Sequence, residues 1–189
     1  MNKDKKNILL GISSSISAYK ACDIAGLLRK EGHTVQAVMT KNATNMITPL
    51  ALQTITGQPV YIDMFELNKT MDVEHISIAQ KSDLVLVAPA TANIIGKVAN
   101  GIADDALSTV IMARKRTTPC LIAPAMNTEM YENPIVQENI EKLKKFKYEF
   151  VEPRIGRLAC GDKGLGALSK PEDIVEAVLK ILEQQDLQG

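Results

Sequence analysis

Short apolar runs alternate with longer amphipathic stretches along most of the 189-residue chain. The short runs are nearly continuous in apolar side chains, as strands are when helices cover both faces of a parallel sheet. The longer stretches repeat apolar residues three or four positions apart, which is the spacing of one helix face. The expected strands are 7–12, 35–39, 83–88, 120–123 and 148–151.

Proline and glycine bound several of the helices expected between these strands. Pro49 opens a helix that Gly57 closes, and Pro171 opens the last helix. Parallel strands need crossover connections, so the alternation predicts an α/β, Rossmann-like (flavodoxin-like), doubly wound sheet with helices on both faces. The length suits a single domain over 1–189. Further helices are expected with an apolar face over 16–28, at 93–114 with a break near Gly101, and at 135–146.

The composition excludes several classes of protein. The 22 Lys and Arg residues balance 22 Asp and Glu residues, so the chain lacks the charge signature of a nucleic-acid or anionic-lipid binder. No apolar run reaches the length of a membrane span, and the first one is too short for a signal peptide, so we expect a cytoplasmic protein. Tryptophan is absent and aromatic residues make up 4%, so backbone, methionine and small polar groups would hold any flat ligand.

The cysteines and histidines do not favour a metal site. Three cysteines without a C-x-x-C pair exclude a disulfide framework and a cysteine-rich zinc site, and His33 and His75 lie far apart in sequence. Cys22 and Cys120 fit the pattern of small buried hydrophobic residues. Cys160 differs, because it precedes a glycine in a basic stretch where a thiol could be reactive.

One stretch, 152–170, fits neither the strand nor the helix pattern. It is rich in Gly, Arg and Lys and is long for a connection inside a domain. Such connections are usually lids or binding loops, so we expect an irregular, flexible loop that covers a ligand site. Arg157 and Lys163 within it could meet an anionic group of a ligand or could simply be solvated.

Polar or conformationally special residues follow four of the expected strands. Ligands of open α/β sheets bind at the carboxyl ends of the strands, so these four clusters are expected to converge on one edge. Four clusters that converge on one edge are stronger evidence for a ligand site there than any single cluster. The clusters are Gly11 to Ser17, Thr40 to Asn42, Pro89 to Asn93 and Pro124 to Asn127.

The first cluster is typical of a phosphate-binding turn, with one glycine followed by hydroxyls and N–H groups at a helix start. It does not form the dinucleotide fingerprint, because Ser13 and Ile16 occupy the later glycine positions. The second strand ends at Thr40, where a dinucleotide site has an acidic residue. Both departures favour a mononucleotide such as FMN, but the serines could also merely cap the helix.

The remaining candidates each allow two interpretations. Residues 89–93 could be a capped helix start, or their small side chains could let a flat ring lie against the backbone. Asn127 could cap the next helix, or its amide could hydrogen-bond a carboxylate or a flavin edge. A lone histidine such as His75 is more often structural than catalytic.

Taken together, these motifs resemble the flavin-dependent cysteine decarboxylases over nearly the whole chain, from Ile8 to about Leu182. His75 falls at the family's active-site histidine. Residues 11–20 are similar to the family's phosphate turn, and residues 158–162 are similar to its substrate clamp. Pro89-Ala90-Thr91-Ala92-Asn93 is similar to the family's Pro-Ala-Ser-Ala-Asn motif. Residues 124–131 are similar to the motif Pro-x-Met-Asn-x-x-Met-Trp, with Tyr131 in place of Trp.

The resemblance implies an FMN enzyme that decarboxylates 4′-phospho-N-pantothenoylcysteine to 4′-phosphopantetheine in coenzyme A biosynthesis. The thiol-bearing carbon would be oxidised to a thioaldehyde, CO₂ would leave, and the resulting enethiol would be reduced again. In the family's terms His75 is the base or orienting group, Asn127 binds the substrate carboxylate, and Cys160 donates the proton for the final reduction. The other residues implied are Met130, Ala159 and Gly161 for the substrate, and Gly11, Ser13, Ser14, Thr40, Ala88, Pro89, Ala90, Thr91, Ala92, Asn93 and Ala125 for FMN.

Relatives of other function remain alternatives. Peptidyl-cysteine decarboxylases of lantibiotic maturation share the histidine and both flavin motifs but match the Ala-Cys-Gly-Asp clamp less well. Flavin prenyltransferases share the fold but lack the combination of His75 and the clamp cysteine. Phosphatase-regulating relatives are binding proteins that typically carry long acidic tails, which this sequence does not show.

The resemblance also implies partners. We expect a homotrimer, with further assembly into a dodecamer as an open possibility, and no nucleic-acid or membrane partner. In many bacteria the decarboxylase is fused to phosphopantothenoylcysteine synthetase, which makes its substrate. No such domain follows Gly189, which leaves a stand-alone enzyme and a fragment of a longer chain as alternatives.

Overall fold

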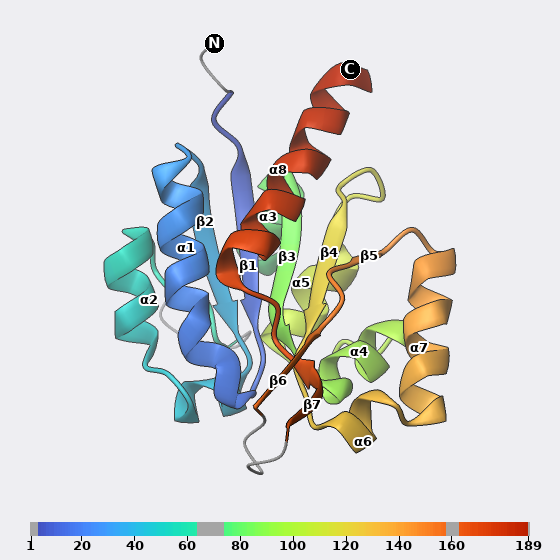
Figure 1. Ribbon diagram of the computed structural model, residues 1–189. Helices are drawn as coiled ribbons and strands as arrows, with labels where there is room; N and C mark the ends of the chain where they lie inside the picture. The colour runs from blue at the N-terminus through green and yellow to red at the C-terminus, as the bar shows by residue number, and fades with distance from the viewer. Residues whose placement is uncertain (1–3, 64–73, 158–162, 189) are drawn as a thin grey trace.

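Five parallel strands form the central sheet of the computed structural model, which describes residues 4–63, 74–157 and 163–188 (Figure 1). The order β2-β1-β3-β4-β5 reverses direction between β1 and β3, which makes the ends of these two strands the topological switch point. The strands are β1 (Asn7–Ile12), β2 (Thr34–Met39), β3 (Leu84–Ala90), β4 (Cys120–Pro124) and β5 (Glu149–Phe150).

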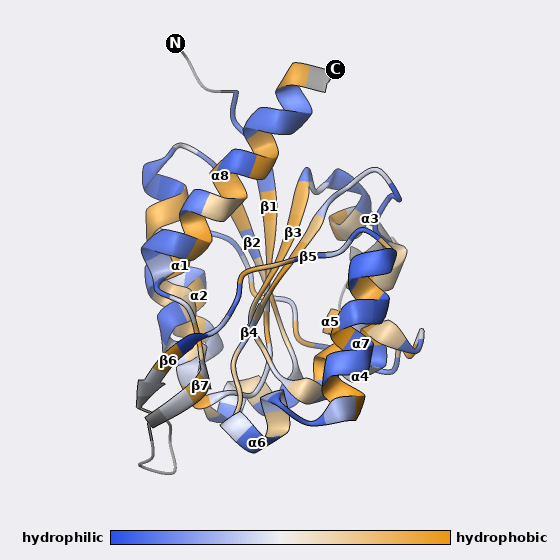
Figure 2. Cartoon of the chain, turned by 45° about the vertical axis from the view of Figure 1, so that its right-hand side comes forward, coloured by the Kyte–Doolittle hydropathy of each residue, from blue (hydrophilic) through white to orange (hydrophobic). Residues whose placement is uncertain are grey.

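Helices cover both faces of the sheet, and Figure 2 shows their hydrophobic sides turned toward it. One layer consists of α1 (Lys20–Lys30), α2 (Pro49–Thr56) and α8 (Pro171–Gln188). The other consists of α3 (Glu74–Lys81), α4 (Ala92–Ala99), α5 (Ala106–Ala113) and α7 (Pro134–Lys145). Short connecting helices are η1 (Ile16–Tyr19), η2 (Lys41–Asn45) and α6 (Thr128–Tyr131).

Successive strand residues bury their side chains in two separate cores. Leu10 and Leu86 pack with α1 and α8, whereas Leu9 and Val85 pack with the helices of the other layer. All four side chains are fully buried, and burying one side chain of this size contributes roughly 1.5–3 kcal/mol. The predicted doubly wound fold is therefore confirmed.

Helices end or are interrupted near the glycines that the sequence marked as helix breakers. Gly57 adopts a φ of 66° and ends α2. In the stretch predicted as a helix at 93–114, α4 ends at Ala99, just before Gly101 with its φ of 70°, and α5 begins at Ala106. Strand β3 runs two residues beyond its predicted end at Ala88, and the Ala88–Pro89 peptide bond is cis.

The prediction of an irregular loop at 152–170 is wrong for the described part of that stretch. Antiparallel strands β6 (Arg154–Arg157) and β7 (Lys163–Ala167) form a two-stranded ribbon there. A ribbon whose strands pair mainly with each other needs no apolar alternation, and its Gly, Arg and Lys residues therefore gave no strand signal. Residues 158–162 lie outside the described residues.

Among the described residues, no helix has both the length and the apolar character needed to cross a bilayer.

Candidate active site

Hydrogen bonds join the carboxyl ends of the central strands into one continuous edge, here called the carboxyl edge. The Ser13 N–H donates to the carbonyl of Pro89 (3.2 Å), which joins the end of β1 to β3. The Ala125 N–H donates to the carbonyl of Ala90 (2.9 Å), which joins the end of β4 to β3. The predicted convergence of strand ends is confirmed, since these residues meet at the switch point.

Ser13 has a structural role that its sequence position did not reveal. Its side chain is buried, and its hydroxyl donates to the carbonyl of Pro89 (2.8 Å) and accepts from the N–H of Thr91 (2.9 Å). A buried hydroxyl of this kind satisfies backbone groups that would otherwise be buried without partners. Ser13 thus fixes the turn after β3 against β1.

Gly11 lies within β1, where it allows close packing of a helix. A Cβ atom built on Gly11 would collide with the Leu107 side chain of α5. The glycine is therefore explained by helix–strand packing, and its predicted place in a cofactor turn stays a prediction.

The start of α4 is open at the carboxyl edge. Thr91, its N-cap residue, makes no side-chain capping bond, so in the described part of the chain the first N–H groups of the helix, at Ala92 and Asn93, are left without a capping side chain. The nearby Ser14 is half-buried, and its hydroxyl makes no hydrogen bond among the described residues. Uncapped N–H groups at a helix start are donors suited to phosphate, and Ser14 directly follows Ser13, whose hydroxyl accepts from the Thr91 N–H at that start. The residues present therefore fit a phosphorylated cofactor.

Thr40 directly follows β2 on the same edge. Its N–H donates to the carbonyl of Ile12 (3.0 Å), and its hydroxyl oxygen accepts from the N–H of Ala43 (3.2 Å) to cap η2. The hydroxyl proton is not used in that capping bond.

The small residues of the β3 and β4 ends are buried and build the edge with their backbone. They contribute no bulky or polar side chain, so a ligand above them would contact backbone and methyl groups. These residues are Ala88, Pro89, Ala90 and Ala125, whereas Asn93 is exposed at the start of α4.

Asn127 caps the single-turn helix α6. Its side-chain oxygen accepts from the N–H of Glu129 (2.8 Å), which confirms the capping interpretation, while its contact with a carboxylate stays a prediction. Met130 on the same turn is 48% exposed. The buried hydroxyl oxygen of Thr128 has no hydrogen-bond partner in the described structure, an arrangement that is costly unless a ligand or partner supplies one.

The ribbon formed by β6 and β7 is seated against the segment that carries Asn127. The Met126 N–H donates to the carbonyl of Gly166 (2.9 Å), and Gly166 has a φ of 132°. A Cβ at Gly166 would collide with the Met126 carbonyl oxygen, so only glycine fits this contact without displacement. The ribbon therefore lies beside the predicted carboxylate-binding residue.

Several predicted residues have no described side chain. His75 is the second residue of α3, but its side chain lies outside the described structure. The same holds for Ala159, Cys160 and Gly161 as whole residues. Their predicted roles stay predictions.

The two described cysteines behave as core residues. Cys120 is fully buried, and burial raises the pKa of its thiol to about 12. Cys22 packs partly buried against the core, and burial raises its pKa as well. Neither thiol is suited to ionise near neutral pH. No group of three His, Cys, Asp or Glu side chains that could hold a metal occurs in the described ranges.

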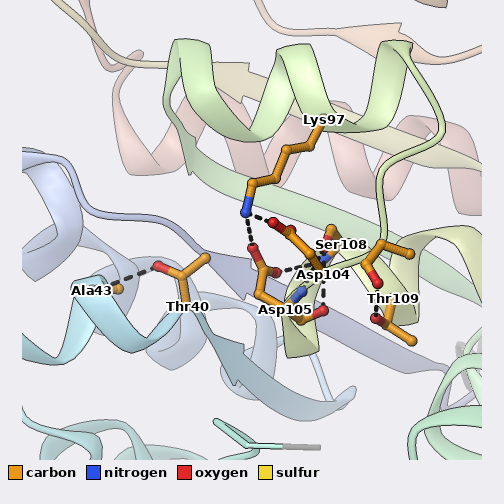
Figure 3. A network of polar contacts seen from close by, with 8 residues as sticks. Thr40, Ala43, Lys97, Asp104, Asp105, Ser108 and Thr109 are labelled. Carbon is orange, nitrogen blue, oxygen red and sulfur yellow. Dashed lines mark hydrogen bonds and ion pairs between the residues drawn. The ribbon is translucent and has the colours of Figure 1, made fainter.

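A charged cluster that the sequence did not reveal fixes the corner between α4 and α5 (Figure 3). Lys97 lies 2.6 Å from a carboxylate oxygen of Asp104 and 2.6 Å from one of Asp105. Asp105 also accepts from the Ser108 N–H (2.8 Å) and so caps α5. Burial opposes ionisation of Asp105, but the bonds from Lys97 and Ser108 lower its pKa below the ordinary value. This corner holds the start of α5, from which Leu107 reaches Gly11.

A family model described as Flavoprotein matches residues 1–183. The chain belongs to the flavoprotein family. A probable phosphopantothenoylcysteine decarboxylase of Streptococcus mutans is 44% identical over 173 residues, which cover 92% of this flavoprotein and 97% of the relative. This flavoprotein spans about half the length of the curated bifunctional relatives it matches. The coenzyme A biosynthesis bifunctional protein CoaBC of Borreliella burgdorferi, for example, is 46% identical over 98% of the chain and 47% of its own length.

Two solved structures are similar over almost the entire flavoprotein. A cysteine-to-serine mutant of PPC decarboxylase, complexed with pantothenoylaminoethenethiol, matches with a TM-score of 0.86 and 31% identity, covering 95% of this chain and 100% of that one. The FMN binding protein AtHal3 matches with a TM-score of 0.82 and 30% identity, covering 96% of this chain and 98% of that one.

Proposed function

We propose that this flavoprotein is an FMN-dependent phosphopantothenoylcysteine decarboxylase. It would convert 4′-phospho-N-pantothenoylcysteine to 4′-phosphopantetheine and CO₂ in coenzyme A biosynthesis. The observation that carries the proposal is the meeting, on one edge, of an uncapped helix start and the ribbon seated beside Asn127. The similarity to a decarboxylase across 97% of that relative's length supports the same reaction.

The described residues that would hold FMN lie around the switch point. The N–H groups at the start of α4, with the hydroxyls of Ser14 and Thr91, would bind its phosphate. The buried backbone from Ala88 to Ala90 would support the ring. When bound, FMN would accept two electrons from the substrate and later return them.

The protein's own groups would then bind the substrate and move its protons. The amide of Asn127 would hold the carboxylate, with Met130 beside it. His75 would take or orient the proton of the substrate thiol while the thiol-bearing carbon becomes a thioaldehyde. The thioaldehyde accepts the electron pair left by CO₂, which a simple cysteine carboxylate cannot do. Cys160 would donate the proton that accompanies reduction of the enethiol to the product thiol.

Assembly and partners are part of the same proposal. We expect a homotrimer, with assembly of four such trimers into a dodecamer as the alternative. The bifunctional relatives support a partnership with the synthetase that makes the substrate. We expect both activities in the cytoplasm.

Two substrates test the proposal against its main alternative. The purified flavoprotein is incubated with 4′-phospho-N-pantothenoylcysteine and, separately, with a peptide that ends in cysteine, and CO₂ is measured. Release from the phosphorylated compound alone is expected. Release only from the peptide would favour a peptidyl-cysteine decarboxylase, and release from neither would favour a binding protein.

A further inference from the structure

Helix α6 is joined to the ribbon segment at two points, one on each side of Asn127. On one side, the Met126 N–H bonds to the carbonyl of Gly166 in β7 (2.9 Å). On the other side, the Tyr131 hydroxyl donates to the carboxylate of Glu152, two residues before β6 (2.9 Å). The turn that carries Asn127 is thus held between two hydrogen bonds.

Tyr131 is well placed to act as an anchor. Its side chain is 7% exposed, and its carbonyl accepts from the side-chain amide of Gln137 on α7 (2.5 Å). Burial, together with the bond to Glu152, raises the pKa of the Tyr131 hydroxyl to about 12. The hydroxyl therefore remains a hydrogen-bond donor throughout the neutral range.

Glu152 is in turn positioned from α7. Its second carboxylate oxygen lies 3.7 Å from the ammonium group of Lys144, which also pairs with Glu141 (2.9 Å) and lies over the ring of Phe150 (5.8 Å). Arg154 Nε donates to the carbonyl of Leu168, the residue after β7 (3.0 Å), and this hydrogen bond joins the two ends of the ribbon. The Glu152 carboxylate that accepts the hydrogen bond from Tyr131 is thus also positioned by Lys144.

We propose that Tyr131 and Glu152 form a positioning pair that sets the orientation of α6, and with it of Asn127, relative to the ribbon. A helix of one turn cannot fix its own position, because an isolated turn of helix is unstable. Its orientation therefore depends on the bonds at its two ends. The proposal rests on the proposed function only for the role of Asn127 at the substrate carboxylate.

A set of matched variants tests the pair kinetically. Removing one hydrogen bond to a charged group in Tyr131→Phe or Glu152→Ala is expected to raise KM about tenfold, with kcat changed less than about twofold. Glu152→Gln keeps an acceptor and should stay within about threefold of wild type. The double variant should be no worse than Glu152→Ala alone, because both substitutions remove the same hydrogen bond. Tyr148→Phe is the control, since it removes a hydroxyl that accepts from Arg114 instead (3.0 Å).

Hydrogen exchange of the flavin-loaded protein supplies a readout independent of activity. The peptide 124–131 should exchange at least about threefold faster in Tyr131→Phe and Glu152→Ala than in wild type, with peptides of β1 unchanged. Unchanged exchange at 124–131, additive effects in the double variant, or an equal KM change in Tyr148→Phe would each overturn the pairing. A protein that decarboxylates neither substrate would refute the proposed function, and the exchange result would still decide the structural coupling.

Discussion

Ser13 is bonded twice to the carbonyl of Pro89, through its N–H (3.2 Å) and through its hydroxyl (2.8 Å). The same hydroxyl accepts from the N–H of Thr91, just where α4 begins. One buried side chain thus links the two strands at the switch point to the helix start that would bind phosphate.

Ser13→Ala and Ser14→Ala should separate stability from cofactor binding. Ser13→Ala leaves the Thr91 N–H without its acceptor, so the free energy of unfolding should fall by about 1–3 kcal/mol. Ser14→Ala removes a hydroxyl with no bond in the described structure, so stability should stay within about 0.5 kcal/mol while FMN affinity falls about tenfold. Urea unfolding of the apoprotein and FMN titration measure the two effects. Equal changes in stability and in FMN affinity in the two variants would contradict a structural role for Ser13 and a cofactor-binding role for Ser14.

The corner between α4 and α5 should depend on one of its two aspartates more than the other. Asp105→Ala removes both the cap of α5 and a partner of Lys97, at an expected cost of about 1–2 kcal/mol. Asp104→Ala removes an exposed ion pair alone and should cost less than about 0.5 kcal/mol. Thermal unfolding at neutral pH compares them, and equal losses would show that the cap contributes little.

Much of the fold could be predicted because it follows from local patterns. Apolar runs marked the strands, and Gly57 and Pro171 marked helix boundaries through their own backbone preferences. The β6–β7 ribbon was missed because Gly, Arg and Lys make up most of its residues and because its two strands pair mainly with each other.

The site was predictable only in outline. The convergence of the strand ends followed from the topology of parallel sheets. The role of Ser13 was hidden, because a serine after a strand looks the same whether it binds a ligand or a carbonyl. The pairing of Tyr131 with Glu152 joins residues far apart in sequence, and no local pattern signals such a bond.

Alkaline pH should destabilise the protein through Cys120. Its thiol ionises near pH 9 in the unfolded chain, but burial raises the pKa in the folded protein to about 12. Between these values the unfolded state releases a proton that the folded state keeps, so stability falls by up to about 1.4 kcal/mol per pH unit. Cys120→Ala should unfold more easily at neutral pH yet lose less stability between about pH 8 and pH 10. Identical pH slopes in wild type and Cys120→Ala would contradict the assignment.

The two half-reactions should be separable by mutation. His75→Asn should prevent reduction of the flavin by substrate under anaerobic conditions, because in the proposed mechanism His75 takes or orients the proton of the substrate thiol. Cys160→Ser should release CO₂ but accumulate the enethiol, because in the proposed mechanism Cys160 donates the proton for its reduction. Stopped-flow absorbance and product mass spectrometry measure these steps. Full activity in Cys160→Ser would remove that thiol from the mechanism.

The most direct measurement of the central claim is the reaction with 4′-phospho-N-pantothenoylcysteine by the purified, FMN-loaded protein. Product mass and CO₂ should be followed together. We predict one CO₂ released for each 4′-phosphopantetheine formed, with the flavin oxidised again at the end. Recovery of unchanged substrate from a fully FMN-loaded protein would contradict the account.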